Sequence, residues 1–122
     1  MADKEKEYDY HRVMEAATRG HHFMQDKEIR KVVVFDRYIC MVRAGDELYA
    51  MKNKCPHSGG NIHEGFLDAN CDIVCPLHRM RFSIKDGKNT SGEGYYLENY
   101  PVQVREGKVY VGLPRKRFLG IF

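Results

Sequence analysis

The chain has 122 residues, which is the length of one ordinary domain and too short for two. Its 20 Lys and Arg residues outnumber its 17 Asp and Glu residues by three, and a net charge of +3 is too small for the basic stripe of a nucleic-acid-binding protein. The longest apolar run, 38–42, has five residues, whereas a membrane-spanning helix needs about 20. We therefore expect neither a nucleic-acid partner nor a membrane span.

Whether the cysteines form disulfides depends on the cellular compartment in which the protein is expected to work. Residues 1–12 alternate in charge and lack the apolar stretch of a secretory signal, so we expect a cytoplasmic protein. Because the cytoplasm is reducing, the four cysteines are not interpreted first as disulfides. Cys40 lies among apolar residues and is predicted to be a small core residue, and Cys71 is predicted to be a loop thiol.

Residues 1–22 are interpreted as an N-terminal extension that can form a short helix. Tyr10, Val13, Met14 and Ala17 follow the i, i+3, i+4, i+7 spacing of an amphipathic helix, and a glycine at position 20 would end it. His21 and His22, which follow, are interpreted as part of a solvated linker.

From residue 29 the pattern changes to short apolar strands separated by turn residues. Strands are predicted over 31–35, 38–43 and 48–52. Near the end, valines alternate with polar residues on either side of a Glu-Gly turn: Val102, Val104, Val109 and Val111. Short strands joined by close turns indicate an all-β domain over 23–114, built as an antiparallel sandwich or small barrel.

Residues 53–82 break this strand pattern. The segment is poor in apolar periodicity but contains several glycines, two prolines, and three of the four cysteines. Two short units stand out in it, Cys55-Pro56-His57 and Cys75-Pro76-Leu77-His78, with 17 residues between His57 and Cys75. Each unit places one thiolate and one imidazole on a single loop, and two such loops can close a four-ligand metal site.

Two kinds of metal centre fit these four ligands. A tetrahedral zinc can take two Cys and two His, but structural zinc sites usually carry like ligands on each loop. The mixed loops favour a binuclear iron centre in which one iron takes both thiolates and the other takes both imidazoles. The order C-x-H followed by C-x2-H is the one that a Rieske [2Fe–2S] centre uses.

The two segments Cys55-Pro56-His57-Ser58-Gly59-Gly60 and Cys75-Pro76-Leu77-His78 resemble the two cluster-binding loops of Rieske proteins. The resemblance extends from about residue 32 to residue 111. It implies a Rieske iron–sulfur fold, an antiparallel β-sandwich with a cluster-binding subdomain at about 53–82. It also implies one [2Fe–2S] cluster per chain, with Cys55 and Cys75 on the buried iron and His57 and His78 on the outer iron.

At several positions the chain differs from the Rieske proteins of bc-type complexes, and these differences indicate which kind of Rieske protein it resembles. Rieske proteins of bc-type complexes carry an additional loop disulfide, but those positions are Gly60 and Leu77 here. The same proteins place Ser and Tyr hydroxyls near the cluster where this chain has Met80 and Phe82, which cannot donate to sulfur. Because hydrogen bonds to sulfur stabilise the reduced cluster, we predict a potential near the bottom of the Rieske range, roughly −150 to +300 mV.

The resemblance implies a free-standing ferredoxin, a non-catalytic electron carrier. The remaining histidines, such as His11 and His63, do not form the mononuclear iron motif of an oxygenase domain, and His63 is predicted to be an exposed loop residue. We expect a flavin-dependent reductase as electron donor and an oxygenase or similar redox enzyme as acceptor. The alternatives are a small subunit of a nitrite-reductase-type complex, and a zinc or other structural or sensory module.

The C-terminal tail, 115–122, is basic and then apolar. It is predicted to fold back on the sandwich, and the alternative is a docking or oligomerisation element because apolar tails rarely stay exposed.

Overall fold

The computed structural model describes residues 8–15 and 24–115, which form ten strands and one short 3-10 helix. The elements in chain order are β1 (Tyr8–Glu15), β2 (Ile29–Val34), β3 (Arg37–Ala44), β4 (Glu47–Lys52), η3 (Ile62–Glu64), β5 (Phe66–Leu67), β6 (Asp72–Val74), β7 (Arg81–Ser83), β8 (Asn99–Tyr100), β9 (Val102–Arg105) and β10 (Lys108–Pro114). The predicted all-β class is confirmed. The predicted strands at 31–35, 38–43 and 48–52 correspond to β2, β3 and β4, and the alternating valines lie on β9 and β10.

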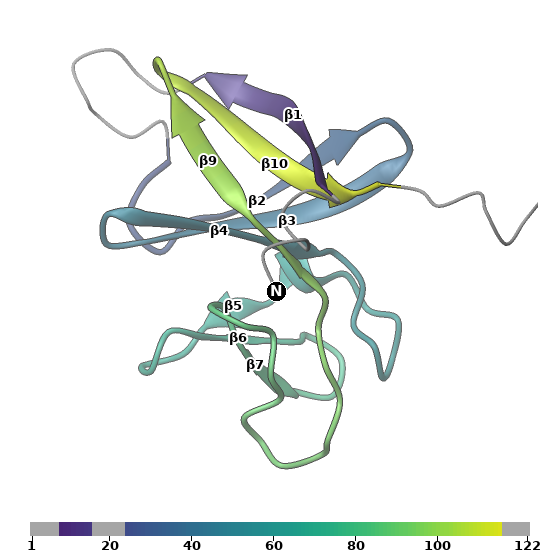
Figure 1. Ribbon diagram of the computed structural model, residues 1–122. Helices are drawn as coiled ribbons and strands as arrows, with labels where there is room; N and C mark the ends of the chain where they lie inside the picture. The colour runs from purple at the N-terminus through teal and green to yellow at the C-terminus, as the bar shows by residue number, and fades with distance from the viewer. Residues whose placement is uncertain (1–7, 16–23, 116–122) are drawn as a thin grey trace, which may run out of the picture.

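The strands form three antiparallel sheets that lie as three layers (Figure 1). The sheet orders are β1-β10-β9, β2-β3-β4-β8 and β5-β6-β7. The first two sheets form the sandwich, and the third belongs to a smaller subdomain below it (Figure 1). The middle sheet therefore has a neighbouring layer on each side.

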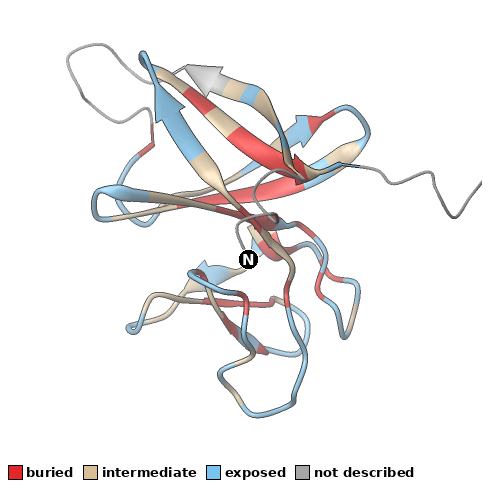
Figure 2. Cartoon of the chain, in the orientation of Figure 1, coloured by how far each residue is buried: buried red, intermediate tan, exposed pale blue. Residues whose placement is uncertain are grey.

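Strand β3 is buried on both faces, which explains its uninterrupted apolar sequence (Figure 2). Ile39 and Met41 belong to the core shared with β10, and both are fully buried. Cys40 and Val42 point the other way, into the core under the small subdomain, and are also fully buried. Cys40 is thus a core residue as predicted, and burial raises the pKa of its thiol to about 12.

The predicted N-terminal helix is wrong where the structure describes it, because residues 8–15 form strand β1. This strand pairs with β10, from Tyr8 opposite Pro114 to Glu15 opposite Lys108, and it completes the sandwich. The register shifts between Arg12 and Met14, which leaves Val13 as the extra residue of a β-bulge. A bulge resets the strand's two-residue alternation, so Tyr10 and Val13 have a spacing of three that resembles a helix. Ala17, His21 and His22 lie outside the described residues.

The small subdomain extends beyond the predicted boundary at residue 82. Ile84 and Leu97 are buried in the same core as Phe82, and an isolated bridge joins Lys88 to Tyr96. The segment that follows β7 therefore returns across the subdomain before it enters the sandwich as β8.

In the described part of the chain, no helix is both long enough and apolar enough to span a membrane. The tail beyond residue 115 lies outside the described residues, so its predicted packing stays a prediction.

Candidate metal centre

The two Cys/His loops have the same backbone hydrogen bonds. In the first loop, the Cys55 N–H donates to the Gly60 carbonyl at 2.9 Å and the Gly59 N–H donates to the Cys55 carbonyl at 2.9 Å. In the second loop, the Cys75 N–H donates to Met80 at 2.8 Å and the Arg79 N–H donates to Cys75 at 3.0 Å. Each cysteine is thus fixed at the entrance of a closed loop whose two ends are hydrogen-bonded to each other.

The equivalence extends to the backbone angles. The fourth residue after each cysteine has a positive φ, +76° at Gly59 and +58° at Arg79. Glycine adopts this conformation without steric cost, whereas arginine does so only when the surrounding structure requires it. In the first loop a glycine allows the positive φ. In the second loop the surrounding fold must impose it on Arg79.

The four predicted ligands are brought together as two like pairs. Cys55 and Cys75 are buried, with 2% and 0% of their surface exposed, and both belong to the core beneath the loops. His57 and His78 are exposed, and their ring centroids lie 5.0 Å apart. One end of the site thus presents sulfur inside the protein, and the other presents imidazole at the surface.

Ser58 lies between the two thiols. Its Oγ is 3.5 Å from the Sγ of Cys75, and it also hydrogen-bonds Cys55. Burial raises the pKa of the Cys55 thiol, but the Ser58 hydroxyl and the backbone N–H groups of Ser58 and His57 lower it more. The net result is a pKa below the ordinary value for cysteine, which favours the thiolate that iron binds.

This donor arrangement fits a binuclear cluster. The two thiols lie inside the protein and the two imidazoles lie at its surface, so like donors are grouped at each end of the site. These pairs of like ligands match the requirement of a cluster whose two irons carry different donors. Such a cluster, when bound, supplies a reversible one-electron couple.

A buried amide fixes the start of the first loop. Asn53, 5% exposed, accepts a 2.7 Å hydrogen bond from the His63 N–H on its Oδ1, and its Nδ2 donates to the His63 Nδ1 at 3.0 Å. His63 is therefore half-buried, and its imidazole is hydrogen-bonded to Asn53. The sequence had predicted an exposed loop residue instead.

We expect Asn53→Ala to lower the free energy of unfolding by about 1–2 kcal/mol, because the His63 N–H would lose its acceptor in a buried position. Thermal or urea unfolding of the purified protein measures the change. Asn53→Asp keeps an oxygen acceptor for that N–H, and it should lose less stability than the alanine variant. Equal losses in both variants would contradict this role of the amide.

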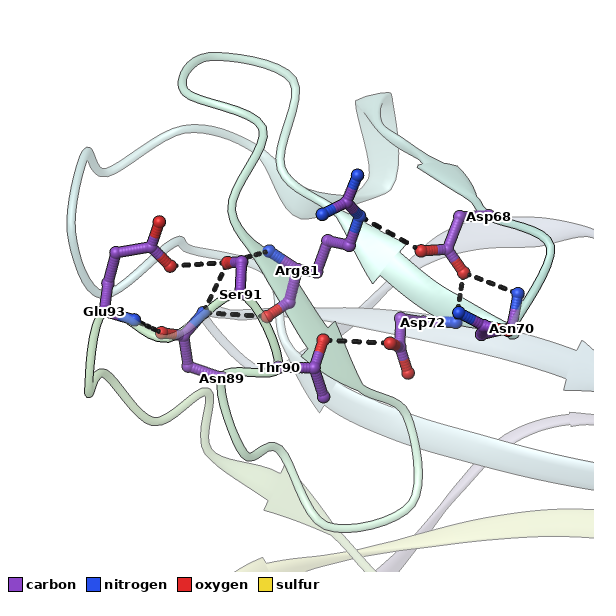
Figure 3. A network of polar contacts seen from close by, with 8 residues as sticks. All are labelled: Asp68, Asn70, Asp72, Arg81, Asn89, Thr90, Ser91 and Glu93. Atoms are coloured by element: carbon purple, nitrogen blue, oxygen red, sulfur yellow. Dashed lines mark hydrogen bonds and ion pairs between the residues drawn. The ribbon is translucent and has the colours of Figure 1, made fainter.

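A polar network ties the 89–94 segment to strand β7 (Figure 3). Asn89 is its centre: its Nδ2 donates to the Arg81 carbonyl at 2.8 Å, and its Oδ1 accepts from the Gly94 N–H at 2.9 Å. Arg81 in turn pairs with Asp68 at 3.2 Å. This network connects β7 and the turn before β6 to the residues that precede Tyr95. The Tyr95 ring lies 5.1 Å from the His57 ring.

Two residues of the site were not found from sequence. Ser58 lies inside the first motif, so a hydroxyl next to a predicted ligand was an available signal. Tyr95 is well outside both motifs, and no local pattern indicates that the chain returns there to His57. Cys71 is half-buried in a turn with a φ of +63°, consistent with the predicted loop thiol.

The β fold and the paired thiols and imidazoles are those of a protein that carries an iron–sulfur cluster. A family model described as Rieske [2Fe-2S] domain matches residues 16–101. The 3-phenylpropionate/cinnamic acid dioxygenase ferredoxin subunit of Escherichia coli (strain K12) is 34% identical over 77 residues, which are 62% of this chain and 73% of that protein.

Solved structures show the same fold. A chain in the complex of reduced oxygenase and oxidized ferredoxin in carbazole 1,9a-dioxygenase superposes with a TM-score of 0.74 at 31% identity, covering 88% of this chain and 96% of that one. The ferredoxin of carbazole 1,9a-dioxygenase from Nocardioides aromaticivorans IC177 gives a TM-score of 0.73 at 26% identity, covering 88% and 98%.

The chain belongs to the Rieske [2Fe–2S] domain family. Its cofactor is a Rieske [2Fe–2S] cluster, and it is an electron-transfer component of an oxidoreductase system.

Proposed function

We propose that this protein passes electrons, one at a time, from a flavin-dependent reductase to an oxygenase. In this proposal Cys55 and Cys75 bind the inner iron of the cluster, and His57 and His78 bind the outer iron. The observation that carries the proposal is the arrangement of the site, with two buried sulfurs and two adjacent rings at the surface.

The exposed imidazoles give the electron a short route out of the protein. A partner that docks over His57 and His78 comes into direct contact with the outer end of the site. The loops themselves do not need to open, because the rings are already exposed. The protein's own task is to hold these rings and to exclude water from the thiol end.

The choice of an oxygenase as acceptor is supported by the relatives. The E. coli relative is a dioxygenase ferredoxin subunit, and the carbazole 1,9a-dioxygenase structure contains an oxygenase with a ferredoxin. The small subunit of a putative NADH-dependent nitrite reductase from Mycobacterium tuberculosis shares the fold, with a TM-score of 0.75, but at 18% identity this likeness concerns the fold alone.

An EPR spectrum of the dithionite-reduced protein, produced with iron, tests the cluster assignment. We expect the anisotropic signal of a Rieske centre, and a colourless protein with zinc bound would contradict the proposal. A second experiment tests the proposed electron donor and acceptor. The protein is immobilised on a column, and the proteins that it retains from the organism's own extract are identified. Recovery of a reductase and an oxygenase supports the proposal, whereas recovery of a large haem or flavin nitrite reductase would overturn it.

The docking surface around the rings includes apolar side chains. Leu77 directly precedes His78 and is 58% exposed, and Tyr95, beside His57, is 39% exposed. A partner that covers the rings would bury both side chains, which favours association through the hydrophobic effect.

We expect Leu77→Asp to lower the second-order rate of electron transfer to the oxygenase about tenfold, equivalent to about 1.4 kcal/mol. The charge would be desolvated on docking, while the reduction potential and the EPR signal should change little. Stopped-flow mixing of the reduced protein with the purified oxygenase measures the rate. Phe35→Asp is the matched control, because Phe35 is 79% exposed but lies at the β2–β3 turn of the sandwich. Equal slowing by both variants would contradict docking at Leu77.

A further inference from the structure

The two Cys/His loops carry positive charge and no negative charge. Residues 53–60 and 75–80 contain one cation each, Lys54 and Arg79, and neither segment contains Asp or Glu. Both cations are exposed, and Arg79 directly follows the exposed ring of His78. The Lys54 side chain lies along the first loop, with its Cε 3.7 Å from the position that a Cβ at Gly59 would occupy. A partner that covers the rings therefore meets a positive charge from each loop.

Neither of these cations is used inside the described part of the protein. Within residues 8–15 and 24–115, the Arg79 guanidinium and the Lys54 ammonium form no hydrogen bond, ion pair or aromatic contact. Glu93 lies in the segment before Tyr95, but its carboxylate accepts a hydrogen bond from the Ser91 hydroxyl and pairs with neither cation. Both positive charges are therefore available to a partner.

The backbone at Arg79 does not favour an arginine. Its φ is +58°, and the equivalent position of the first loop is Gly59. Because glycine adopts a positive φ without steric cost, the second loop would close as readily with glycine there. Lys27 has a φ of +66°, so this conformation alone identifies no function. Arg79 differs from Lys27 in its place beside an exposed ring of the site.

We propose that Arg79 and Lys54 bind carboxylates on an acidic surface of the oxygenase and so orient it over the two exposed rings. This inference rests on the proposed function. A guanidinium can hold a carboxylate through two parallel hydrogen bonds, which fixes the direction of approach as well as the charge. Opposite charges on the two proteins also steer their encounter, so the association rate should fall as the salt concentration rises.

Arg79→Gln tests the proposal because it removes the charge and keeps a long side chain. We expect the second-order rate of electron transfer to the oxygenase at low salt to fall about fivefold, the factor that corresponds to two unit charges about 4 Å apart in water. The dependence of the rate on ionic strength should weaken, and the EPR signal should stay unchanged. Stopped-flow mixing of the reduced protein with the purified oxygenase over a range of salt concentrations measures both effects. Lys54→Gln should act in the same direction, and Arg79→Lys should recover most of the rate.

Arg79→Gly separates docking from folding. Glycine relieves the positive φ, so this variant should resist denaturant at least as well as the unaltered protein. Its rate of electron transfer should nevertheless fall as far as that of Arg79→Gln. Loss of the rate only in proportion to a loss of folded protein would overturn the docking role.

Lys27 provides a control that matches Arg79 in charge, exposure and backbone conformation. The Lys27 N–H donates to the Arg43 carbonyl at 2.7 Å, at one end of β3. The first loop begins at the other end of this strand, where the Asn53 N–H donates to the Tyr38 carbonyl at 3.2 Å. Lys27→Gln removes one positive charge far from the first loop, and it should leave the rate unchanged.

The outcomes separate this inference from the proposed function. Equal slowing by Arg79→Gln and Lys27→Gln would overturn the inference, because the effect would then be one of net charge. Slower electron transfer from the reductase, with unchanged transfer to the oxygenase, would also overturn it, because the cations would then serve the donor. Absence of electron transfer from the unaltered protein to the oxygenase would instead overturn the proposed acceptor.

Discussion

Replacing His78 with alanine is expected to abolish the Rieske optical and EPR signature. His78 is one of the two exposed rings, and its removal would leave the outer iron with a single imidazole ligand from the chain. The structure offers no substitute in the second loop, because the neighbouring side chains there are Leu77 and Arg79. Visible absorption and EPR of the iron-loaded variant measure the result. His78→Cys should also lose the signature, because the outer iron would take sulfur in place of nitrogen.

His63→Ala is the matched control for this experiment. His63 lies between the two motifs in the sequence, but its Nδ1 is hydrogen-bonded to the Asn53 side chain. It is not one of the four proposed cluster ligands. The control should lose stability and keep its spectrum. An unchanged spectrum in His78→Ala would remove His78 from the ligand set, and loss of the spectrum in His63→Ala would add a residue to it.

Gly65→Ala is expected to destabilise the small subdomain severely and to lower its cluster content. A Cβ at this position would lie 1.9 Å from the carbonyl oxygen of Val74, the residue directly before Cys75. A backbone oxygen cannot rotate away as a side chain can, so β5 and β6 must separate or the second loop must shift. We expect a loss of about 3 kcal/mol in the free energy of unfolding. Denaturant unfolding and the iron content per chain measure the two effects.

Gly92→Ala separates this clash from the general cost of replacing a glycine. Gly92 has a φ of +91° but nothing within 4 Å of the added Cβ. It should lose about 1 kcal/mol from backbone strain alone. A loss in Gly65→Ala no greater than in this control would show that the subdomain can adjust around residue 65.

The sequence indicated the two Cys/His loops that the fold brings together, but it did not indicate the edge strand of the sandwich. The Cys55 and Cys75 loops could be identified because chemistry fixes the ligand type and spacing within a few residues. Strand β1 was missed because its pairing with β10 is formed between opposite ends of the chain, and the bulge at Val13 disrupts the alternation that marks a strand. Local periodicity has no information about such a distant partner.

The two residues beside the predicted ligands show a similar contrast. Ser58 was visible in the motif, but its direction toward sulfur depends on the closed loop and on the Gly60 N–H. The Tyr95 ring lies 5.1 Å from the His57 ring, and Tyr95 directly follows the 89–94 segment that the network around Asn89 holds in place (Figure 3). Contacts of this kind arise from tertiary structure and have no short sequence signal.

Strand β3 of the middle sheet is buried on both faces, and this bears on the speed of electron exchange. Cys40 and Val42 pack in the core beneath the loops. Ile39 and Met41, on the opposite face of the strand, pack in the core of the sandwich. A close-packed support of this kind resists displacement. With a cluster bound between the loops, this support would limit the movement of Cys55 and Cys75 when the charge of the cluster changes, and it would keep the reorganisation energy small. A carrier built in this way can exchange electrons rapidly even when the driving force between donor and acceptor is slight.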